Sequence, residues 1–275
     1  MRLRGRRRVL AVAAPPVQAA GPVLPTDFTA ERIAVVAHWR LESTVSLSTN
    51  RLVAALVADG YTVLLCSAAE VSQPLIWPEG LPDRTSVFRR ANVGYDFGTW
   101  AAILDLYPGV LDAQIALLVN DSLIGPFAPL DEILLDMASS PVDIWGLVST
   151  VQDGPHLQSH WVAYKNGALK RRGMREFWRE IRIEPTKRDL ILRYEIGMSE
   201  VAERDKLTMG SGFRHDLVVP DGMNPSTVGW RRMLIWGFPF VKREVIVAAP
   251  VEIVDSADVP GVIQDMFGED VYEWI

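Results

Sequence analysis

The sequence has very little cysteine and lacks the short motifs that mark several large enzyme classes. Cys66 is the only cysteine among 275 residues, so an internal disulfide and a CxxC motif are both excluded. The chain also lacks the GxSxG turn of α/β-hydrolases and the GxxxxGK loop that cradles nucleotide phosphates. Hydrolase, P-loop and zinc-ribbon classes are therefore excluded, and a reducing, cytoplasmic compartment is expected.

Long apolar runs and clustered positive charge are also missing from most of the chain. No stretch reaches the roughly 18 apolar residues that a membrane-spanning helix needs. Five of the 28 basic residues lie within the first eight positions, so the rest of the chain carries 23 basic and 34 acidic residues, or about −11. Because nucleic acid binds basic surfaces, we expect no nucleic-acid partner.

The first 30 residues differ in character from the rest. Their arginines precede the apolar run Val9 to Ala14, as in a secretory signal peptide, but Pro15 and Pro16 interrupt that run after six residues. We therefore expect a disordered basic lead-in over residues 1–30. Such a segment contacts anionic lipid weakly, which allows at most peripheral attachment to the inner face of the membrane. Residues 31–275 are expected to form one domain.

From Ile33 onward, short apolar segments alternate with segments of helical periodicity. Strands are expected at 33–37, 61–67, 86–89, 115–119 and 143–150, and helices at 43–59, 131–138 and from Trp100 to Tyr107. The segment 157–164 is expected to return antiparallel across the sheet. Further helices are expected at 174–181 and 187–206, the latter ended by Gly210-Ser211-Gly212. This order predicts an α/β fold with a mixed, mostly parallel sheet and flanking helices.

Two polar loops flank one buried strand between Arg89 and Ser122. Gly94 and Gly98 surround Tyr95-Asp96-Phe97 where a strand changes to a helix, and glycine there lets the backbone approach a ligand. The apolar run 115–119 ends at Asn120-Asp121-Ser122, and polar groups at that position lie at the ligand-binding edge of an open α/β sheet. Either loop alone is equally compatible with an ordinary turn, an Asx turn or a helix start that favours an acid.

The pairing of these loops resembles the donor half of glycosyltransferases with the GT-A architecture. It resembles more closely the rhamnan synthesis protein F family of bacterial polysaccharide rhamnosyltransferases, over roughly Ile33 to Arg243. The residues that carry the resemblance are Arg90, Asn92, Gly94, Tyr95, Asp96, Gly98, Asn120, Asp121, Ser122, Gly125 and Pro126. The resemblance implies a GT-A-like, Rossmann-type domain with a nucleotide-sugar donor half at 31–150 and a helical acceptor half at 151–275.

The same resemblance implies transfer of a deoxyhexose, L-rhamnose from dTDP-rhamnose, to a cell-surface polysaccharide or lipid-linked glycan with inversion. It assigns donor binding to His38, Arg90, Asn92, Gly94, Tyr95, Asp96, Asn120, Asp121, Ser122 and Lys242. Asp121 is also the catalytic candidate that holds the diphosphate, either directly or through Mg²⁺ or Mn²⁺. The usual GT-A triplet has two carboxylates, whereas this one has only Asp121, so metal dependence stays open.

Glu195 is the candidate catalytic base, because inversion requires a group that takes the acceptor proton. Burial beside Tyr194 is expected to raise the pKa of Glu195 for that task. Glu200 and Asp189 are lesser alternatives, and a charged residue on a long helix also commonly faces water. Acceptor binding is assigned to Gln158, Ser159, His160, Trp161 and Tyr194. His156 and His160 have the spacing of a helical zinc pair, but Pro155 opposes a helix and the metalloprotease Glu is missing.

Two other functions stay open at this stage. A non-catalytic nucleotide-sugar-binding subunit of a polysaccharide-synthesis complex is compatible with the single carboxylate of the triplet. A sugar-phosphate transferase of capsule synthesis is the other alternative, and it would leave a nucleoside monophosphate as product. Analysis of the released nucleotide separates the two enzymes.

Overall fold

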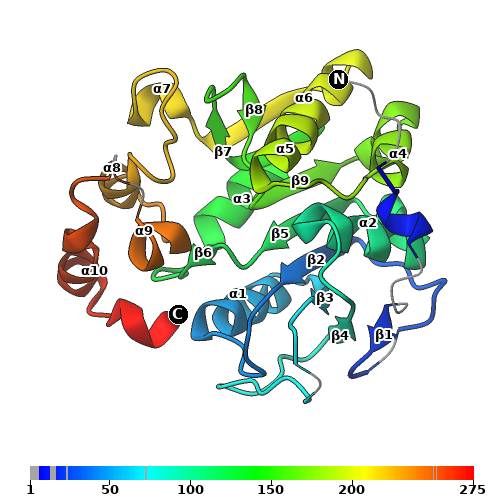
Figure 1. Cartoon of the computed structure of the whole chain (residues 1–275), viewed down its shortest axis with the longest axis horizontal. Helices are drawn as coiled ribbons and strands as arrows, with labels where there is room; N and C mark the ends of the chain where they lie inside the picture. Colours follow the sequence, from blue (N-terminus) through cyan, green and yellow to red (C-terminus); the bar gives the residue numbers. More distant parts are fainter. Residues whose placement is uncertain (1–5, 13–16, 23, 72, 250, 252) are drawn as a thin grey trace.

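A mixed sheet with helices on both faces forms the centre of the molecule, as the computed structural model shows (Figure 1). The structure describes residues 6–12, 17–22, 24–71, 73–249, 251 and 253–275. Within these ranges the sheet has nine strands in the order β1-β4-β3-β2-β5-β9-β7-β10, and β8 pairs with β7. The predicted α/β class with a mixed, mostly parallel sheet is confirmed.

The parallel part of the sheet contains the strands that the apolar runs predict. β2 (Arg32–His38), β3 (Thr62–Ser67), β4 (Thr85–Arg89) and β5 (Ile115–Asn120) run parallel. β9 (Trp161–Lys165) lies antiparallel between β5 and β7 (Ile144–Thr150), and β10 (Met209–Phe213) runs parallel to β7. The short strands are β1 (Gln18–Ala19), β6 (Leu123–Ile124), β8 (His156–Leu157) and β11 (Val241–Lys242), of which β6 and β11 pair separately.

Helices fill the connections between strands and most of the chain beyond Lys165. They are α1 (Leu47–Ala58), α2 (Tyr95–Leu106), α3 (Asp131–Ser139), α4 (Arg172–Arg179), α5 (Lys187–Leu190), α6 (Ile196–Arg204), α7 (His215–Val218), α8 (Trp230–Ile235), α9 (Arg243–Val247) and α10 (Val259–Phe267). Short 3₁₀ turns occur at Val9–Ala11, Pro108–Asp112, Ala168–Lys170, Ser256–Asp258 and Val271–Trp274. A π-helical turn, Ile191–Glu195, joins α5 to α6.

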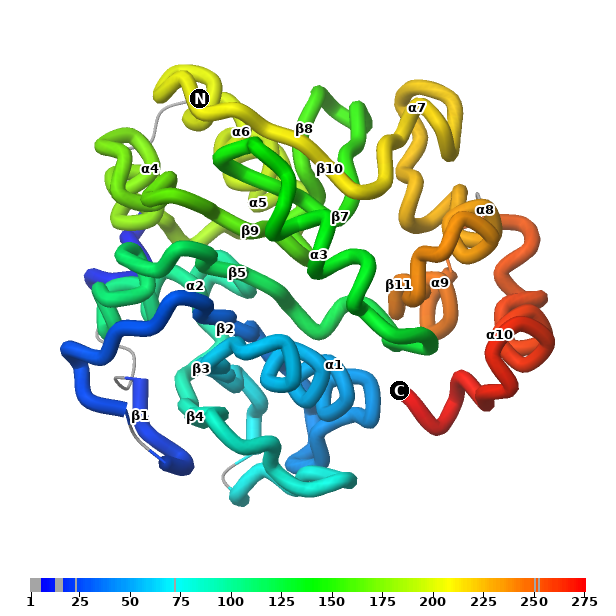
Figure 2. The backbone as a smooth tube through the Cα atoms, turned by 180° about the vertical axis from the view of Figure 1, so that it is seen from behind, coloured from blue at the N-terminus to red at the C-terminus, as the bar shows by residue number. Residues whose placement is uncertain are grey.

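The two faces of the sheet bury two separate cores, because side chains alternate along each strand. Ile33, Val35 and Ala37 of β2 pack with α2, α4 and α6, whereas Ala34 and Val36 pack with α1 and α3. A third apolar cluster joins β6 to α8, α9, α10 and the C-terminal residues. Figure 2 shows these last helices gathered at one side of the molecule, with the C-terminal end beside α1.

The glycines at two predicted helix boundaries have different roles from those expected. α2 begins at Tyr95, directly after Gly94 with φ +80°, so Gly98 lies in the first helical turn and not in the loop. Gly210 and Gly212 belong to β10 and do not end a helix. A Cβ on Gly212 would lie 2.7 Å from the Trp145 ring, so the close packing there requires glycine. The helix expected at 187–206 ends at Arg204 and contains the π turn. Close packing, and not chain reversal, accounts for Gly98 and Gly212.

The segment expected as one antiparallel strand at 157–164 is divided. β8 ends at Leu157, residues 158–160 form a connection, and β9 begins at Trp161. The antiparallel direction is confirmed, because β9 pairs antiparallel with both β5 and β7. The break matters for function, since it leaves the side chains of 158–160 outside the alternation of a strand.

Described parts of the N-terminal lead-in lie against the rest of the chain. The amide of Val9 donates to the Ile181 carbonyl at 2.8 Å, Arg6 forms an ion pair with Glu184, and β1 pairs antiparallel with β4. Residues 1–5 and 13–16, with Arg2, Arg4 and the proline pair, lie outside the described residues. Within the described ranges, no helix is both long and apolar enough to cross a bilayer.

Replacing Gly98 with alanine tests the packing of the first turn of α2. A Cβ at Gly98 would overlap the carbonyl oxygen of Val93, so Gly98→Ala is expected to lower the free energy of unfolding by about 2 kcal/mol or more. Gly261→Ala in α10 is the matched control, since nothing lies within 4 Å of its added Cβ, and it should gain about 0.5–1 kcal/mol. Urea unfolding measures both, and a Gly98→Ala variant of unchanged stability contradicts the packing described.

Candidate functional site

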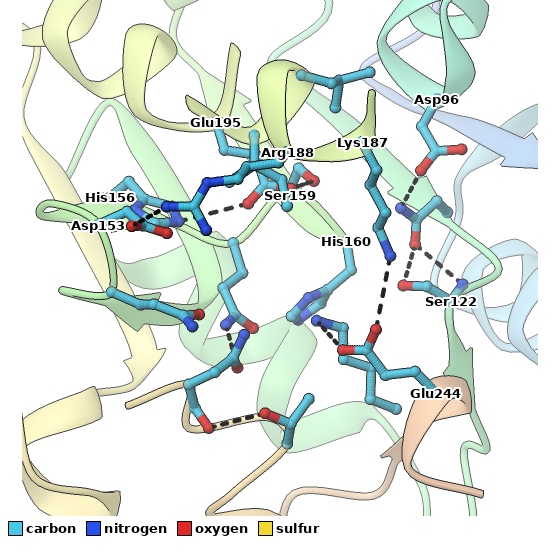
Figure 3. A pocket seen from close by; sticks show the side chains of 18 of the residues that line it. Asp96, Ser122, Asp153, His156, Ser159, His160, Lys187, Arg188, Glu195 and Glu244 are labelled. Carbon is cyan, nitrogen blue, oxygen red and sulfur yellow. Dashed lines mark hydrogen bonds and ion pairs between the residues drawn. The ribbon is translucent and has the colours of Figure 1, made fainter. Parts of the chain in front are cut away.

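A cavity of about 660 Å³ opens beside the carboxyl end of β5. Its walls come from the start of α2, the triplet after β5, the connection 158–160, the α5 segment with the π turn, and the region around α9 (Figure 3). β2 and β5 lie side by side in the sheet. The strands that follow β2 in the chain, β3 and β4, lie on one side of this pair, whereas β7 and β9, which follow β5, lie on the other, so the strand order reverses between β2 and β5. Open α/β sheets bind ligands outside such a switch point. Its volume falls in the range of small-molecule sites.

Asn120 connects the two polar loops on one wall of the cavity. Its side-chain nitrogen donates to Oδ2 of Asp96 at 2.7 Å, and its Oδ1 accepts from the amide and hydroxyl of Ser122 at 3.1 and 2.6 Å. Burial raises the pKa of Asp96 to about 7, and the charge of Asp121 adds to this shift, while the bond from Asn120 opposes it. The loop before α2 and the triplet after β5 therefore meet, as the sequence predicts.

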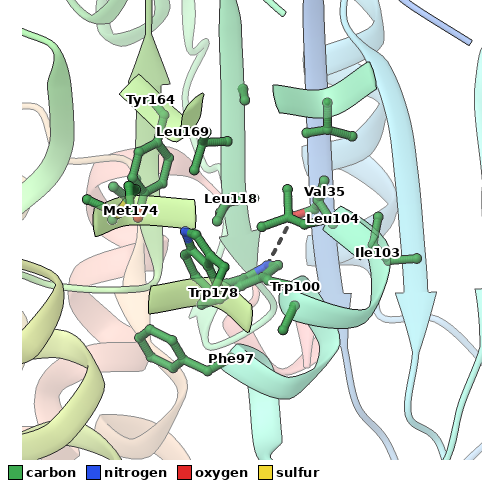
Figure 4. Packing of buried hydrophobic residues seen from close by; sticks show 14 of the residues in the cluster. Val35, Phe97, Trp100, Ile103, Leu104, Leu118, Tyr164, Leu169, Met174 and Trp178 are labelled. Carbon is green, nitrogen blue, oxygen red and sulfur yellow. Dashed lines mark hydrogen bonds between the residues drawn. The ribbon is translucent and has the colours of Figure 1, made fainter. Parts of the chain in front are cut away.

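The first turn of α2 is held in place by the aromatic core behind it. Phe97 stacks on Trp178 with ring centres 5.7 Å apart, and Trp100 meets Trp178 edge-on at 6.3 Å. The Trp100 indole nitrogen donates to the Val35 carbonyl at 3.2 Å, which ties α2 to β2 (Figure 4). Because these rings are close-packed, they hold the first turn of α2, and with it Asp96, in a fixed position.

Asp121 does not line the cavity. Its Oδ2 accepts from the Trp39 amide at 2.8 Å, and its carbonyl oxygen lies 3.4 Å from Nη2 of Arg243. Among the described residues, no group of three His, Cys, Asp or Glu side chains could hold a metal ion. At phosphate sites Mg²⁺ is usually held by one or two carboxylates together with phosphate oxygens. Asp121 is the one carboxylate of the triplet, its Oδ2 already accepts from the Trp39 amide, and Arg243 lies beside it, so these residues fit a cationic side chain better than Mg²⁺ or Mn²⁺.

Glu195 lies on the opposite wall, at the end of the π turn. Ser159 donates to its Oε1 at 2.6 Å, and Nε2 of His156 lies 3.5 Å from its Oε2. Burial favours a higher pKa for Glu195, but the bonds from His156 and Ser159 and the charge of Lys242 outweigh it and lower the pKa. The expected upward shift is therefore wrong. Sequence reasoning missed the two hydrogen-bonding partners, which reach Glu195 from the β8–β9 connection.

His156 has a defined hydrogen-bonding arrangement. Its Nδ1 lies 2.8 Å from the Gly154 carbonyl, which can only accept, so Nδ1 carries a proton. Nε2 faces Oε2 of Glu195 at 3.5 Å, so the ring lies between the Gly154 carbonyl and the carboxylate and helps to hold the carboxylate in place.

His160 presents an unsatisfied nitrogen at the cavity. The side chain is 3% exposed, and its Nε2 has no hydrogen-bond partner among the described residues. Burial, and then the charge of Lys242, lower the pKa of His160 to about 3, so the ring is neutral. A buried nitrogen without a partner is rare in folded proteins, and a ligand hydroxyl in the cavity can satisfy it.

Ion pairs cross the outer part of the cavity. Lys187 of α5 lies 3.7 Å from Glu244, which also contacts Lys242 at 3.1 Å, and Arg188 lies 3.2 Å from Asp153. Figure 3 shows Lys187 reaching across the opening toward Glu244. Deeper in, the Gln158 amide donates to Asn224 at 2.7 Å. The sequence carries no motif that identifies Lys187, Arg188, Asp153 or Glu244 as residues of this site.

Nine of the residues proposed from the sequence line this one cavity. They are Tyr95, Asp96, Asn120, Ser122, Gln158, Ser159, His160, Glu195 and Lys242. The other proposed site residues do not line it, and they are His38, Arg90, Asn92, Gly94, Asp121, Trp161 and Tyr194. The alternative bases Glu200 and Asp189 do not line it either.

Buried structural roles explain three of the residues that do not line the cavity. Trp161 is 0% exposed, and its indole nitrogen donates to the sulfur of Met137 at 3.4 Å within the core. The Tyr194 hydroxyl donates to Glu184 at 3.0 Å, behind the π turn. Arg90 donates to the Thr99 hydroxyl at 3.0 Å and so braces α2.

The chain resembles one known protein family over most of its length. A family model described as rhamnan synthesis protein F matches residues 81–256, which is more than half of the chain. The match includes Asp96 and Glu195, which lie on opposite walls of the cavity. No curated protein matches the chain.

Asp96→Asn is expected to stabilise the protein above neutral pH. Because the pKa of Asp96 is higher in the folded than in the unfolded state, the folded state binds more protons between pH 3.8 and about 7, and stability falls as the pH rises through that window. Asparagine avoids this loss, so the gain should be on the order of 2 kcal/mol at pH 8, after allowance for partial solvent screening, and small at pH 4. Urea unfolding at both pH values measures it. Asp105→Asn, on the exposed side of the same helix, controls for the change of charge, and a pH-independent effect of Asp96→Asn contradicts the shift.

Proposed function

Because the chain belongs to the rhamnan synthesis protein F family and so has a role in rhamnan polysaccharide synthesis, we propose that it is a glycosyltransferase with a GT-A-like fold. It transfers L-rhamnose from a nucleotide-sugar donor, dTDP-rhamnose, to a polysaccharide or lipid-linked glycan acceptor, and inverts the anomeric centre. The observation that supports this most is the single cavity that has Asp96, Asn120 and Ser122 on one wall and Glu195 on the other.

The donor and acceptor sides of the proposed site come from different parts of the chain. The donor sugar contacts Asp96, Asn120 and Ser122, whose side chains are already joined by hydrogen bonds and need little reordering on binding. The acceptor sugar contacts Gln158, Ser159 and the free nitrogen of His160. Sugar hydroxyls both donate and accept hydrogen bonds, so this mixture of amide, hydroxyl, imidazole and carboxylate groups suits two sugars.

In the proposed reaction Glu195 is the general base. Its carboxylate takes the proton of an acceptor hydroxyl, the hydroxyl oxygen forms a bond to the anomeric carbon, and the bond from that carbon to the donor phosphate oxygen breaks. The nucleoside diphosphate leaves with the bonding electron pair. Ser159 and His156 hold the carboxylate in position, and because they lower its pKa, Glu195 is ionised and ready to accept a proton at neutral pH.

Glu195→Gln tests the assignment of the base. A base of this kind contributes roughly 100- to 10,000-fold, so kcat should fall by that factor while the Kd for the donor stays unchanged. Rhamnosyl transfer and release of dTDP measure the rate. Glu200→Gln is the control, since Glu200 lies on the exposed side of the following helix and does not line the cavity. Equal turnover in Glu195→Gln and the wild-type protein removes Glu195 from the mechanism.

The pH profile distinguishes Glu195 from Asp96 as the base. With Glu195 as base, turnover stays high as the pH falls through 7, because the pKa of Glu195 lies below its usual range. Dependence on ionised Asp96 instead makes turnover fall as the pH drops through about 7. Donor binding without turnover favours the non-catalytic subunit, and release of dTMP in place of dTDP favours the sugar-phosphate transferase.

A further inference from the structure

A cluster of cationic and imidazole groups lies beside the cavity, around Asp121. It consists of His38 at the end of β2, Arg40 two residues later, and Arg243 at the start of α9. Arg243 is anchored to the triplet, because its amide donates to the Ser122 carbonyl at 2.7 Å and its Nη2 approaches the Asp121 carbonyl at 3.4 Å. Trp39 links β2 to the same point through its bond to Asp121.

Two buried nitrogens of this cluster have no partner among the described residues. His38 is 2% exposed, and its Nδ1 contacts the Ser67 hydroxyl at 3.0 Å while its Nε2 is left free. Nη1 of Arg40 is also buried without a hydrogen bond, although its Nη2 lies 3.8 Å from Glu42. Leaving a buried polar nitrogen unpaired is costly, and more so for the charged guanidinium of Arg40, so both nitrogens are suited to meet a ligand that carries oxygen atoms.

The charge of the cluster favours an anion. Arg40, Arg89 and Arg243 carry three positive charges near His38, against the negative charges of Asp121 and of the largely exposed Glu42. The Arg89 guanidinium is also bonded to the Val71 and Gln73 carbonyls. Burial, and then the charge of Arg40, lower the pKa of Arg243, whereas Asp121 acts in the opposite direction. Burial likewise lowers the pKa of His38, so its ring is neutral and Nε2 is available for hydrogen bonding.

The cluster lies next in the chain to residues of the cavity wall that contains Asn120 and Ser122. Asn120 and Ser122 line the cavity on either side of Asp121, and Lys242 and Glu244 line it on either side of Arg243. Arg243, Arg40 and His38 do not line the cavity themselves, so the cluster borders the wall formed by Asn120 and Ser122 without forming part of the cavity. Guanidinium groups bind phosphate oxygens through two parallel hydrogen bonds, and they neutralise charge on a leaving phosphate as a divalent metal does.

We propose that Arg40, Arg243 and His38 bind the diphosphate of the donor and stabilise the leaving nucleoside diphosphate, so that this protein needs no divalent metal for that step. The proposal rests on the proposed glycosyl transfer, and it specifies how the charge of the leaving group is neutralised. Asp121 then orients the cluster through Trp39 and its contact with Arg243, and is not itself a metal ligand.

Binding of inorganic pyrophosphate and of nucleoside diphosphates to the full chain tests the proposal, by calorimetry in EDTA and again with Mg²⁺ or Mn²⁺. We expect the Kd of dTDP to differ by less than about threefold between these buffers. Arg243→Gln should weaken both pyrophosphate and dTDP at least tenfold, yet leave thymidine binding nearly unchanged. Arg172→Gln, whose side chain is 91% exposed on α4, should change none of these values.

A second variant keeps the test decisive if Arg243→Gln does not fold. Arg40→Gln removes the nitrogen without a partner, from a loop at the end of β2, and should give the same selective loss of pyrophosphate affinity. Metal-dependent binding, or unchanged pyrophosphate affinity in Arg40→Gln or in folded Arg243→Gln, overturns this inference while sugar transfer still stands. Failure of every nucleoside diphosphate to bind the wild-type protein, together with no transfer from any nucleotide sugar, overturns the proposed function itself.

Discussion

The hydrogen bond from Asn120 to Asp96 is the contact on which the candidate site depends. It joins the end of β5 to the first turn of α2, two segments that the sheet alone does not hold together. The aromatic core under α2 fixes one partner, and the hydrogen-bonded turn of Asn120 with Ser122 fixes the other. Asp96 is therefore a partly buried acid with a raised pKa. Groups of this kind are concentrated at functional sites, where catalysis and binding need shifted pKa values.

Asp96 and Glu195 show how two carboxylates in one cavity acquire opposite properties. Burial acts in the same direction on both, but Asp96 has a single hydrogen-bond donor and a second acid nearby. Glu195 has the donors Ser159 and His156 as well as the charge of Lys242, so its ionised form is favoured. The environment therefore separates a group that titrates near neutrality from one that stays charged, as acid–base chemistry at a single site requires.

Local patterns were sufficient to predict the parallel strands and the meeting of the two polar loops that contain Asp96 and Asn120. Apolar runs followed by polar triplets identify β5 and its ligand edge, because both faces of that strand are buried. The wall formed by residues 158–160 was harder to predict, since the break between β8 and β9 determines which side chains leave the sheet. Trp161 resumes the strand and points into the core, whereas Ser159 and His160 reach the cavity. The partners of Glu195 come from distant segments, so its pKa shift could not be inferred from its neighbours in sequence.

The π turn at Ile191–Glu195 gives the molecule a length-sensitive element. Such a turn holds one residue more than a regular helical turn, and it separates Tyr194, which faces the core, from Glu195, which faces the cavity. Loss of a single residue there would let the segment close into a regular α turn, which covers nearly the same angle with one residue fewer, so the flanking helices α5 and α6 would keep their register. Only the side chains inside the turn would be redistributed, so the separate directions of Tyr194 and Glu195 depend on the number of residues in the turn as well as on their types.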